Sequence, residues 1–407
     1  MSTHTSVDRR ATMKILNITA QKPSSTGSGV FLSELVRVFA AQGHAQMVIA
    51  GVDAEDQPVF PEGVRFLPVL FHSAKLPFAI VGMSDEMPYT STRYCDMTPG
   101  MTGQFEAAFS NAIRRAMAEF QPDVVLCHHL YLLTAIVREI VTDIPVYGFC
   151  HNTDLRQMRK HGLMRDRIAA AIRKLDRIFV LRSDQIREVH EVYGADPEKM
   201  TPIGMGYNRH VFFPTERTQE SMIRLIYAGK ITQKKGVRSL IQALSLINEP
   251  AGTLELVCAG GAGNEEEYRE IVDLAKRSPY PITFTGRLDQ KTLALWYNRS
   301  DIFVLPSFYE GIPLTVIEAL ACGCRVVISD LPGVREWLDE FVTGADIRYV
   351  PLPTIRNTDE AVEEELPAFE QRLADALRES IHTPAAGPCD VSRISWERIG
   401  NLVLYKQ

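Results

Sequence analysis

One stretch of the sequence, residues 301–336, constrains the fold more than any other. The apolar run 302–305 predicts a buried strand, and a polar turn and a helix over about 313–322 follow it. Gly323 suits the position just past the end of such a helix. The apolar run 325–329 predicts a second strand, so the stretch has the strand, helix, strand order from which parallel sheets are built.

Two carboxylates accompany this helix, Glu310 just before it and Glu318 inside it. Eight positions at helical rise separate them by on the order of 10 Å, which is comparable to the span from a hexose, across a diphosphate, to a ribose. The N–H groups of Leu314 and Thr315 at the helix start would favour the diphosphate. We therefore predict that both carboxylates accept hydrogen bonds from sugar hydroxyls, although a loop carboxylate and a solvated helix residue are the simpler alternative.

The same stretch resembles the signature of the retaining glycosyltransferases of family 4, which have the GT-B fold. The matching pattern is PS-x-x-EG-x-P-x-x-x-x-EA-x-A-x-G before a strand, and the wider resemblance covers about residues 13–340 and the last helix. It implies an α/β protein with two Rossmann-like doubly wound domains facing across a cleft and a C-terminal helix crossing back.

Length and composition agree with this fold. A chain of 407 residues with 45% apolar and 23% charged residues is long enough for two globular domains. We expect a disordered tail over 1–12, an acceptor-binding domain over 13–213, a nucleotide-sugar-binding domain over 214–390, and a helix in 391–407 that packs back on the first domain.

Charge and cysteine content narrow the partners and the compartment. A net charge of −6 argues against a general nucleic-acid binder. Seven cysteines, an odd number mostly inside apolar patterns, are typical of reduced thiols, so we expect a cytoplasmic protein. No apolar run is long enough to predict a spanning helix.

The first half of the chain opens with a strand over 13–19, the loop PSSTGSG, and a helix over 30–41. Further strands are predicted at 45–50, 65–71, 124–128, 146–150 and 178–181, and this alternation favours a doubly wound sheet. Gly29 in the loop would let the backbone come close to a donor phosphate. The glycine pattern is not the full G-x-G-x-x-G fingerprint, because position 32 is Leu, and this disfavours a dinucleotide-dependent dehydrogenase.

Histidines follow two of these strands, at the carboxyl ends where ligands bind in parallel sheets. The resemblance implies that His151 lies next to the transferred sugar. His128 and His129 are predicted to line the acceptor side. Asp154 is predicted to contact the acceptor or to act as a base.

The segment 156–177 is rich in Arg and Lys with apolar residues interspersed. A solvated amphipathic helix is one interpretation. The other is a surface that attracts an anionic acceptor or the anionic inner face of a membrane. In the second case the protein would associate peripherally with that membrane.

Two lysines mark the second domain. Lys230 and Lys235 flank the turn between a strand over 225–228 and a helix over 237–246. The resemblance implies that they clamp the diphosphate, with Lys230 in place of the usual Arg. No Asp-x-Asp pair suggests a metal-held diphosphate, so we expect no metal and no cofactor beyond the nucleotide-sugar co-substrate.

The resemblance implies transfer of a hexose or N-acetylhexosamine from a nucleotide diphosphate sugar, with UDP as the expected nucleotide, to an acceptor hydroxyl with retention. It also implies that His151 and Glu310 are the catalytic residues. The acceptor, a glycan, a lipid-linked glycan or a small molecule, is left open. The main alternative is a nucleotide-sugar epimerase of the same fold, and a glycosyl phosphorylase and a non-catalytic sugar-binding protein are further alternatives.

Overall fold

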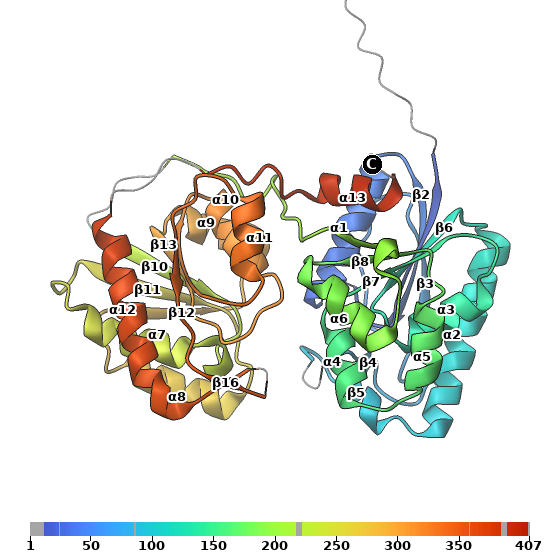
Figure 1. Ribbon diagram of the computed structural model, residues 1–407, viewed down its shortest axis with the longest axis horizontal. Helices are drawn as coiled ribbons and strands as arrows, with labels where there is room; N and C mark the ends of the chain where they lie inside the picture. The colour runs from blue at the N-terminus through green and yellow to red at the C-terminus, as the bar shows by residue number, and fades with distance from the viewer. Residues whose placement is uncertain are drawn as a thin grey trace, which may run out of the picture. The chain divides into compact units, whose positions relative to one another are not determined.

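The computed structural model describes residues 12–23, 25–84, 87–216, 222–357, 359–383 and 389–405. The predicted disordered tail, residues 1–12, lies outside these ranges except for Thr12. The chain divides into two compact units, one made of residues up to Gly204 together with those from Ile399 onward, and the other of Met205–Arg398. Each unit is built around a parallel sheet (Figure 1).

The first unit contains, among its described residues, a seven-stranded sheet in the order β3-β2-β1-β6-β7-β8-β9, with all neighbouring strands parallel. The order reverses direction between β1 and β6. Its strands are β1 Lys14–Thr19, β2 Ala45–Val52, β3 Arg65–Leu70, β6 Val124–His128, β7 Val146–Phe149, β8 Arg177–Val180 and β9 Met200–Pro202, with a small pair β4 Val81–Gly82 and β5 Thr92–Arg93. Its helices are α1 Gly27–Ala41, α2 Pro99–Glu119, α3 Leu132–Ile140, α4 Thr153–Lys160, α5 Arg165–Ile172 and α6 Asp184–Tyr193.

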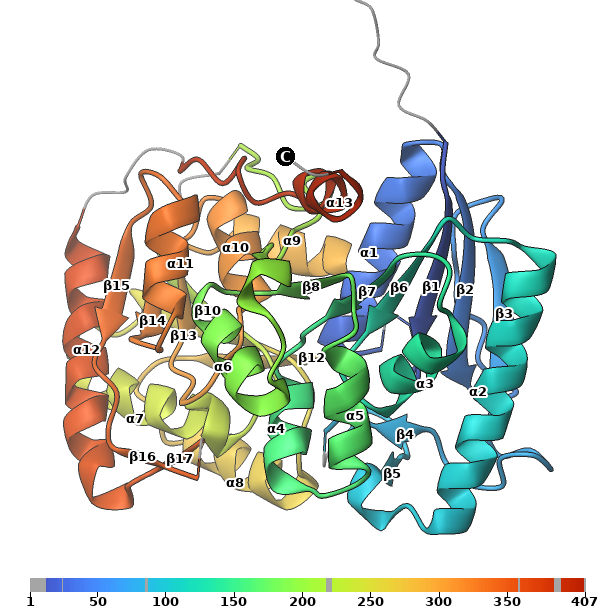
Figure 2. The same cartoon turned by 45° about the vertical axis from the view of Figure 1, so that its right-hand side comes forward.

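Helices cover both faces of this sheet, as right-handed crossovers require (Figure 2). On one face, Leu32 and Val36 of α1 pack with Val48 and Ala50 of β2. The other face carries the larger core, where aromatic residues of α2 and apolar residues of α3 and α5 pack against the sheet. The central strands are therefore buried on both sides, which is why their sequences read as continuous apolar runs rather than as alternating patterns.

Helix α1 begins earlier than the sequence predicts. Residues 27–29 were expected in a loop, but the helix starts at Gly27 because Thr26 caps it. The Thr26 hydroxyl accepts a hydrogen bond from the Gly29 N–H at 3.1 Å, as an N-cap residue does. Gly29 therefore lies in the first turn of a helix and not in an open loop.

The basic segment 156–177 is two short helices, α4 and α5, separated by a break at which Met164 has a φ of +45°. Several of its cations are engaged inside the fold. Arg167 pairs with Glu106 and Glu139, and Arg177 stacks on the Phe179 ring and donates to the Val403 carbonyl. The interpretation of this segment as a single amphipathic helix is therefore wrong.

The C-terminal helix α13, Trp396–Leu404, returns to the first unit from Ile399 onward. Gly400 approaches α1 so closely that a Cβ there would lie 2.8 Å from a methyl of Val38. The Tyr405 hydroxyl lies 3.0 Å from Nε2 of His44. These contacts tie the end of the chain to α1 and to the start of β2.

The second unit holds a six-stranded parallel sheet in the order β12-β11-β10-β13-β14-β15, again among the described residues. This order reverses direction between β10 and β13. The strands are β10 Ile223–Ala228, β11 Leu254–Ala259, β12 Ile282–Gly286, β13 Ile302–Leu305, β14 Arg325–Ser329 and β15 Ile347–Val350, with a small hairpin β16 Ile355–Arg356 and β17 Glu360–Ala361. The helices are α7 Val237–Ile247, α8 Glu265–Ala275, α9 Gln290–Asn298, α10 Leu314–Ala321, α11 Val334–Phe341 and α12 Leu366–His382.

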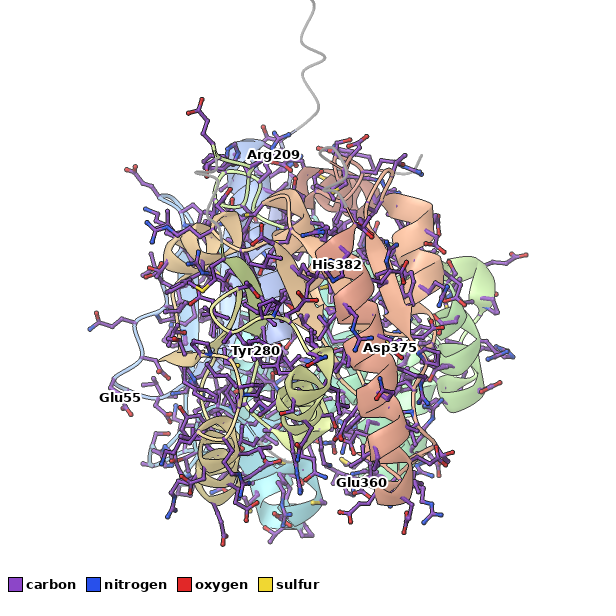
Figure 3. All side chains as sticks on the ribbon, turned by 90° about the vertical axis from the view of Figure 1, so that its left-hand side faces the viewer. Glu55, Arg209, Tyr280, Glu360, Asp375 and His382 are labelled. Atoms are coloured by element: carbon purple, nitrogen blue, oxygen red, sulfur yellow. The ribbon has the colours of Figure 1, made fainter. Side chains whose placement is uncertain are left out.

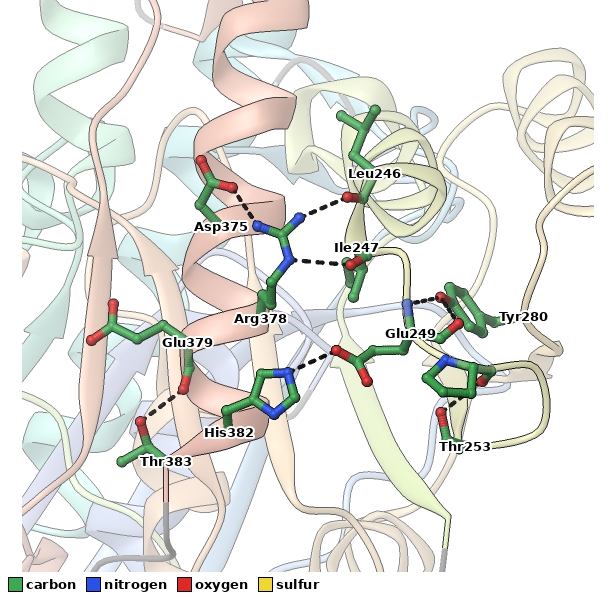
Figure 4. A network of polar contacts seen from close by, with 11 residues as sticks. Leu246, Ile247, Glu249, Thr253, Tyr280, Asp375, Arg378, Glu379, His382 and Thr383 are labelled. Carbon is green, nitrogen blue, oxygen red and sulfur yellow. Dashed lines mark hydrogen bonds and ion pairs between the residues drawn. The ribbon is translucent and has the colours of Figure 1, made fainter.

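Helix α12 is held against the end of α7 by polar contacts (Figure 4). Arg378 donates to the carbonyls of Leu246 and Ile247, which belong to the last turn of α7 and have no partner inside that helix. His382 contacts Glu249 at 2.8 Å. Asp375 and His382 lie along the same helix in the turned view (Figure 3), and Asp375 orients Arg378 at 2.8 Å.

The division between the units falls at Gly204, before the boundary at 213 and 214 that the sequence predicts. The reason lies in the segment that follows. Phe212 packs against Tyr297, with 6.1 Å between ring centroids. Asn298 donates to the Phe213 carbonyl and accepts from the Thr215 N–H, so this segment belongs to the second unit. In the part of the chain that the structure describes, no helix has both the length and the apolarity to cross a membrane.

Replacement of Gly236 tests the packing of the second unit. Gly236 has a φ of +71°, and a Cβ there would lie 2.0 Å from the Pro306 carbonyl oxygen. We expect Gly236→Ala to lower the free energy of unfolding by about 3 kcal/mol or more, from backbone strain and from the clash together. Denaturation in urea measures it.

Gly252→Ala is the matched control, because its φ is +81° and no heavy atom lies within 4 Å of the added Cβ. Only the backbone strain applies there, about 1 kcal/mol. Equal losses in the two variants would show that the loops around Gly236 and Pro306 are not packed as described.

Candidate functional site

The candidate site of the second unit lies where the strand order reverses. Strands β10 and β13 are neighbours, and their connections to α7 and α10 leave the sheet in opposite directions. Such a reversal opens a crevice at the carboxyl ends of the two strands, where ligands bind in open parallel sheets. The predicted donor residues Lys230 and Lys235 follow β10, and Glu310 follows β13.

Lys235 and Glu310 form an ion pair across this reversal. Nζ of Lys235 lies 2.7 Å from Oε1 of Glu310 and 3.4 Å from the carbonyl oxygen of Tyr309. The side chains are 28% and 17% exposed, so both charges remain within reach of a ligand. The structure thus brings together two predicted site residues that are far apart in the sequence.

The two loops that carry this pair are fixed by backbone contacts. The Phe308 N–H donates to the Lys234 carbonyl at 3.1 Å. Gly236 lies against the Pro306 carbonyl, where no larger residue fits. The Thr232 hydroxyl accepts from the Lys235 N–H at 3.3 Å and closes the turn that carries the lysine. The two loops that carry Lys235 and Glu310 are therefore fixed relative to each other.

Lys230 lies on the same turn with an exposed side chain. Its backbone is held by Tyr227, a fully buried residue of β10 whose hydroxyl donates to the Lys230 carbonyl at 2.6 Å. Burial, followed by the nearby charge of Glu310, raises the pKa of Tyr227 well above its usual value, so this hydroxyl keeps its proton. The backbone of Lys230 is thus fixed while its ammonium group stays in water.

Helix α10 presents its start at the same edge. Pro313 is the N-cap residue and makes no side-chain cap, so the helix begins at Leu314 rather than at the proline. The first turn contains Leu314 and Thr315 and no acidic side chain. The first N–H groups of a helix have no partner inside it and attract anions. Glu318 lies one turn further on and is 8% exposed, so it is a buried carboxylate and not a solvated one.

The candidate site of the first unit lies next to the other reversal, between β1 and β6. His128 ends β6, His129 follows it, and His151 comes just after β7. Nδ1 of His128 lies 3.3 Å from Nε2 of His151, and the His129 ring centroid lies 4.8 Å from that of His151. Phe31 of α1 meets the His151 ring edge to face at 5.2 Å.

Burial keeps the three imidazoles neutral. Desolvation, and then the neighbouring His129, lowers the pKa of His128 from 6.5 to about 3. Desolvation also lowers the pKa of His129, although Asp154 opposes this. Desolvation and the two other rings lower the pKa of His151 well below 6.5. A cluster of this kind offers hydrogen bonds to a ligand but no positive charge near neutral pH.

Asp154 has a different position from the one predicted. It is fully buried, and its Oδ2 accepts from the N–H groups of Leu130 and His151 at 2.8 and 3.3 Å. Its Oδ1 accepts from the Cys150 thiol at 3.5 Å. A carboxylate occupied in this way does not meet an acceptor or serve as a base. It joins the loops after β6 and β7 and thereby positions the histidines.

Two residues in these loops have left-handed backbones, His129 with a φ of +74° and Asn152 with a φ of +71°. Such conformations cost free energy for residues other than glycine and cluster at functional sites. Gly29, the remaining predicted donor residue, lies buried in the first turn of α1, and Thr26 accepts its N–H. A donor phosphate could therefore accept from the Gly29 N–H only by replacing the Thr26 hydroxyl as its acceptor.

The sequence analysis missed a charged cluster at the ends of β1, β2 and β3. Lys22 pairs with Asp53 at 2.9 Å and with Asp56 at 2.7 Å, and Nδ1 of His72 lies 2.7 Å from Asp53. Burial acts to lower the pKa of Lys22, but the hydrogen bonds to Asp56 and Asp53 and their charges together outweigh it and raise that pKa. The available signal was that each residue closely follows a strand end. Among the described residues, no three His, Cys, Asp or Glu side chains are placed to hold a metal ion.

Comparison with known proteins gives a consistent result. The family model for glycosyltransferase family 4 matches residues 25–211, and the model for glycosyl transferases group 1 matches residues 223–362. The chain is 25% identical over 401 residues to a glycogen synthase of Mycobacterium tuberculosis, which covers 91% of this chain and 90% of that protein.

Two solved structures show the same fold. Sucrose-phosphate synthase from Thermosynechococcus elongatus superposes with a TM-score of 0.65 at 18% identity, over 96% of this chain and 97% of that one. The Anabaena protein Alr3699/HepE, in complex with UDP and glucose, superposes with a TM-score of 0.60 at 13% identity, over 96% and 95% of the two chains.

The buried histidines generate a prediction about pH and stability. His128 has a lower pKa in the folded protein, about 3, than the ordinary value of 6.5, so the unfolded chain binds the extra proton. Its contribution to stability is complete above pH 6.5 and is lost as the pH falls towards 3. At pH 5.5 we expect the loss from this residue to be about 1 kcal/mol.

Urea denaturation at several pH values from 7.5 to 5.0 measures this loss. In His128→Asn the titrating ring is absent, so the free energy of unfolding should depend less on pH than in the wild-type protein. The comparison uses slopes, because the substitution also changes stability at every pH. Parallel slopes would contradict a neutral, buried His128.

Proposed function

Because this chain belongs to the GT-B glycosyltransferases of family 4, we propose that it transfers a hexose or an N-acetylhexosamine from a nucleotide diphosphate sugar to an acceptor hydroxyl with retention. The observation that carries this proposal is the Lys235–Glu310 ion pair at the reversal between β10 and β13. The Lys235 ammonium group can bind a diphosphate, and the Glu310 carboxylate can accept hydrogen bonds from sugar hydroxyls. Both groups lie on loops that backbone contacts hold in place.

The ion pair explains how the site would accept a donor. An ammonium group has three N–H donors, and in the structure Lys235 uses one on Glu310 and one, at 3.4 Å, on the Tyr309 carbonyl. A diphosphate oxygen would add a second anion to Lys235. Lys235 would then interact with two anions, the diphosphate oxygen and Glu310, and its hydrogen bond to Glu310 would weaken. The carboxylate would then be available to orient hydroxyls of the transferred sugar.

Two further groups would complete the diphosphate site. The N–H groups of Leu314 and Thr315 at the start of α10 offer donors and the positive end of a helix dipole. Lys230, exposed on a backbone fixed by Tyr227, offers a second ammonium group. We assign Glu318, further along α10, to the ribose hydroxyls.

Charge would decide the chemistry of the leaving group. A diphosphate leaves with increasing negative charge, and preorganised cations and N–H donors stabilise that charge in the transition state. Lys235, Lys230 and the start of α10 would supply this stabilisation. The sugar would become oxocarbenium-like, the acceptor hydroxyl would attack from the face of the leaving group, and the departing phosphate would take the proton.

His151 would contribute as a neutral hydrogen-bonding group that steadies the transferred sugar. Its depressed pKa excludes a cationic imidazolium near the positive charge that develops on the sugar ring. His129 packs against it and would line the acceptor side, whereas His128, which was predicted there too, is 2% exposed and contacts His151 itself. For the acceptor, the proposal specifies only a molecule that carries the attacking hydroxyl.

The first donor to test is a UDP-sugar. The Anabaena protein that shares the fold was solved with UDP and glucose, and this supports UDP as the nucleotide for this chain. A screen of nucleotide sugars by thermal shift, followed by mass spectrometry of reactions with cell extracts, would identify the donor and the acceptor. If the donor alone were converted to an epimer, the protein would be an epimerase and not a transferase.

Variants of the ion pair test the proposal. We expect Lys235→Ala to raise the donor KM and to lower kcat, each about tenfold or more, because a charge-assisted hydrogen bond is worth about 1.5–3 kcal/mol. Glu310→Gln should lower kcat about tenfold with an unchanged unfolding midpoint. Steady-state kinetics with the identified donor measure both.

Lys234→Ala is the matched control. Lys234 is the adjacent residue, but its side chain is 53% exposed and pairs with Asp359 at 2.9 Å. Its removal should leave kcat and KM within about twofold, since exposed pairs contribute little. Wild-type kinetics in both Lys235→Ala and Glu310→Gln would refute the site.

A further inference from the structure

The contact between His128 and His151 has the geometry of a hydrogen bond in the plane of both rings. The ring planes differ by 15°, the centroids lie 5.5 Å apart, and Nδ1 of His128 lies 3.3 Å from Nε2 of His151. The centroid separation exceeds the nitrogen separation by about twice the radius of an imidazole ring. Both nitrogens therefore lie on the line between the ring centres, and the rings meet edge to edge and do not stack.

The surroundings hold both rings in this arrangement. Phe149 stacks on His128, with 4.9 Å between centroids and 8° between planes. Phe31 of α1 makes a T-shaped contact with each of the two histidines. Asp154 fixes the backbone of His151 through its N–H. The rotamers of the pair are thus set by packing from three different elements.

The proton between the two rings can be assigned from the other nitrogen of His128. Nε2 of His128 is buried and has no hydrogen-bond partner among the described residues. An orphaned buried N–H donor is rarer than an acceptor without a partner. The proton of His128 therefore belongs on Nδ1, from which it donates to Nε2 of His151. His151, when neutral, then carries its own proton on Nδ1.

We propose that His128 is a positioning residue that fixes the Nδ1–H tautomer of His151, so that His151 presents a neutral N–H donor to a hydroxyl of the substrate. This inference rests on the proposed function for the identity of the substrate. It adds a residue that acts only through another side chain. Because Nε2 of His151 is occupied by His128, Nδ1 is the ring nitrogen that is left for a ligand.

The groups around the pair determine how it responds to pH. His129 faces His151 from the end of β6, and Phe31 from α1 brings no charge. Cys150 precedes His151 in the loop after β7, and Asp154 in the first turn of α4 accepts from the His151 N–H. Asp154 is occupied by backbone N–H groups and the Cys150 thiol. Burial and the two other imidazoles hold the pKa of His151 low, so the donor form should persist in mildly acidic solution.

The direct test is nitrogen NMR of protein labelled with ¹⁵N-histidine, in which two-bond proton–nitrogen correlations distinguish the tautomers. Loss of signals in His151→Gln assigns the His151 ring. We expect a neutral ring with the proton on Nδ1 from pH 7.5 to 5.5. In His128→Leu nothing donates to Nε2 of His151, so the ring should no longer be held in the Nδ1–H form alone and the Nε2–H form should appear beside it.

His128→Asn provides the rescue, because its amide nitrogen is close to the position of Nδ1 and can donate the same hydrogen bond. With the donor identified, His128→Leu should lower kcat about tenfold with the donor KM within twofold. His128→Asn should restore most of kcat.

His44→Gln is the matched control. His44 is another buried histidine of the same unit with a pKa lowered by desolvation, and it pairs with Tyr405 away from the cluster. It should alter stability without changing kcat or the tautomer of His151. An Nε2–H tautomer of His151 in the wild-type protein, or an unchanged tautomer in His128→Leu, would overturn the inference. Absence of transfer with every donor would refute the proposed function alone, because the tautomer is measured without turnover.

Discussion

The constraint on which the structure depends is the reversal of strand order in each parallel sheet. Between β10 and β13, and between β1 and β6, adjacent strands send their connections in opposite directions. Diverging connections leave a crevice at the carboxyl ends of the two strands, and side chains distant in sequence meet there. Lys235 and Glu310 are 75 positions apart and yet lie 2.7 Å from each other for this reason.

The candidate sites at the two reversals differ in how their ionisable groups are exposed and charged. The second unit keeps its charged groups partly exposed and paired, so that an anion can enter and redistribute the pairing. The first unit buries His128 and His129 and partly buries His151, and desolvation keeps the three imidazoles neutral. Its carboxylate, Asp154, is occupied by backbone N–H groups. A diphosphate and a neutral sugar hydroxyl require these two different environments.

Prediction from the sequence was accurate for the strands. The runs 124–128, 302–305 and 325–329 are strands with those same bounds, because continuous apolar runs of this length are typical of strands buried on both faces. It was less accurate where side chains decide the ends of helices. Thr26 starts α1 three residues earlier than the apolar period indicates, and a break at Met164 divides a basic segment that reads as one helix.

The sequence by itself determined the fold family, the order of the elements and the residue types of the donor site, because these depend on local periodicity and on a signature of consecutive residues. Only the tertiary structure decided the roles of Asp154, of the Lys22 cluster and of the His128–His151 pair. Each of these depends on burial and on a partner in another strand connection. Nothing in the sequence around Asp154 distinguishes a carboxylate that meets a substrate from one that accepts the Leu130 N–H.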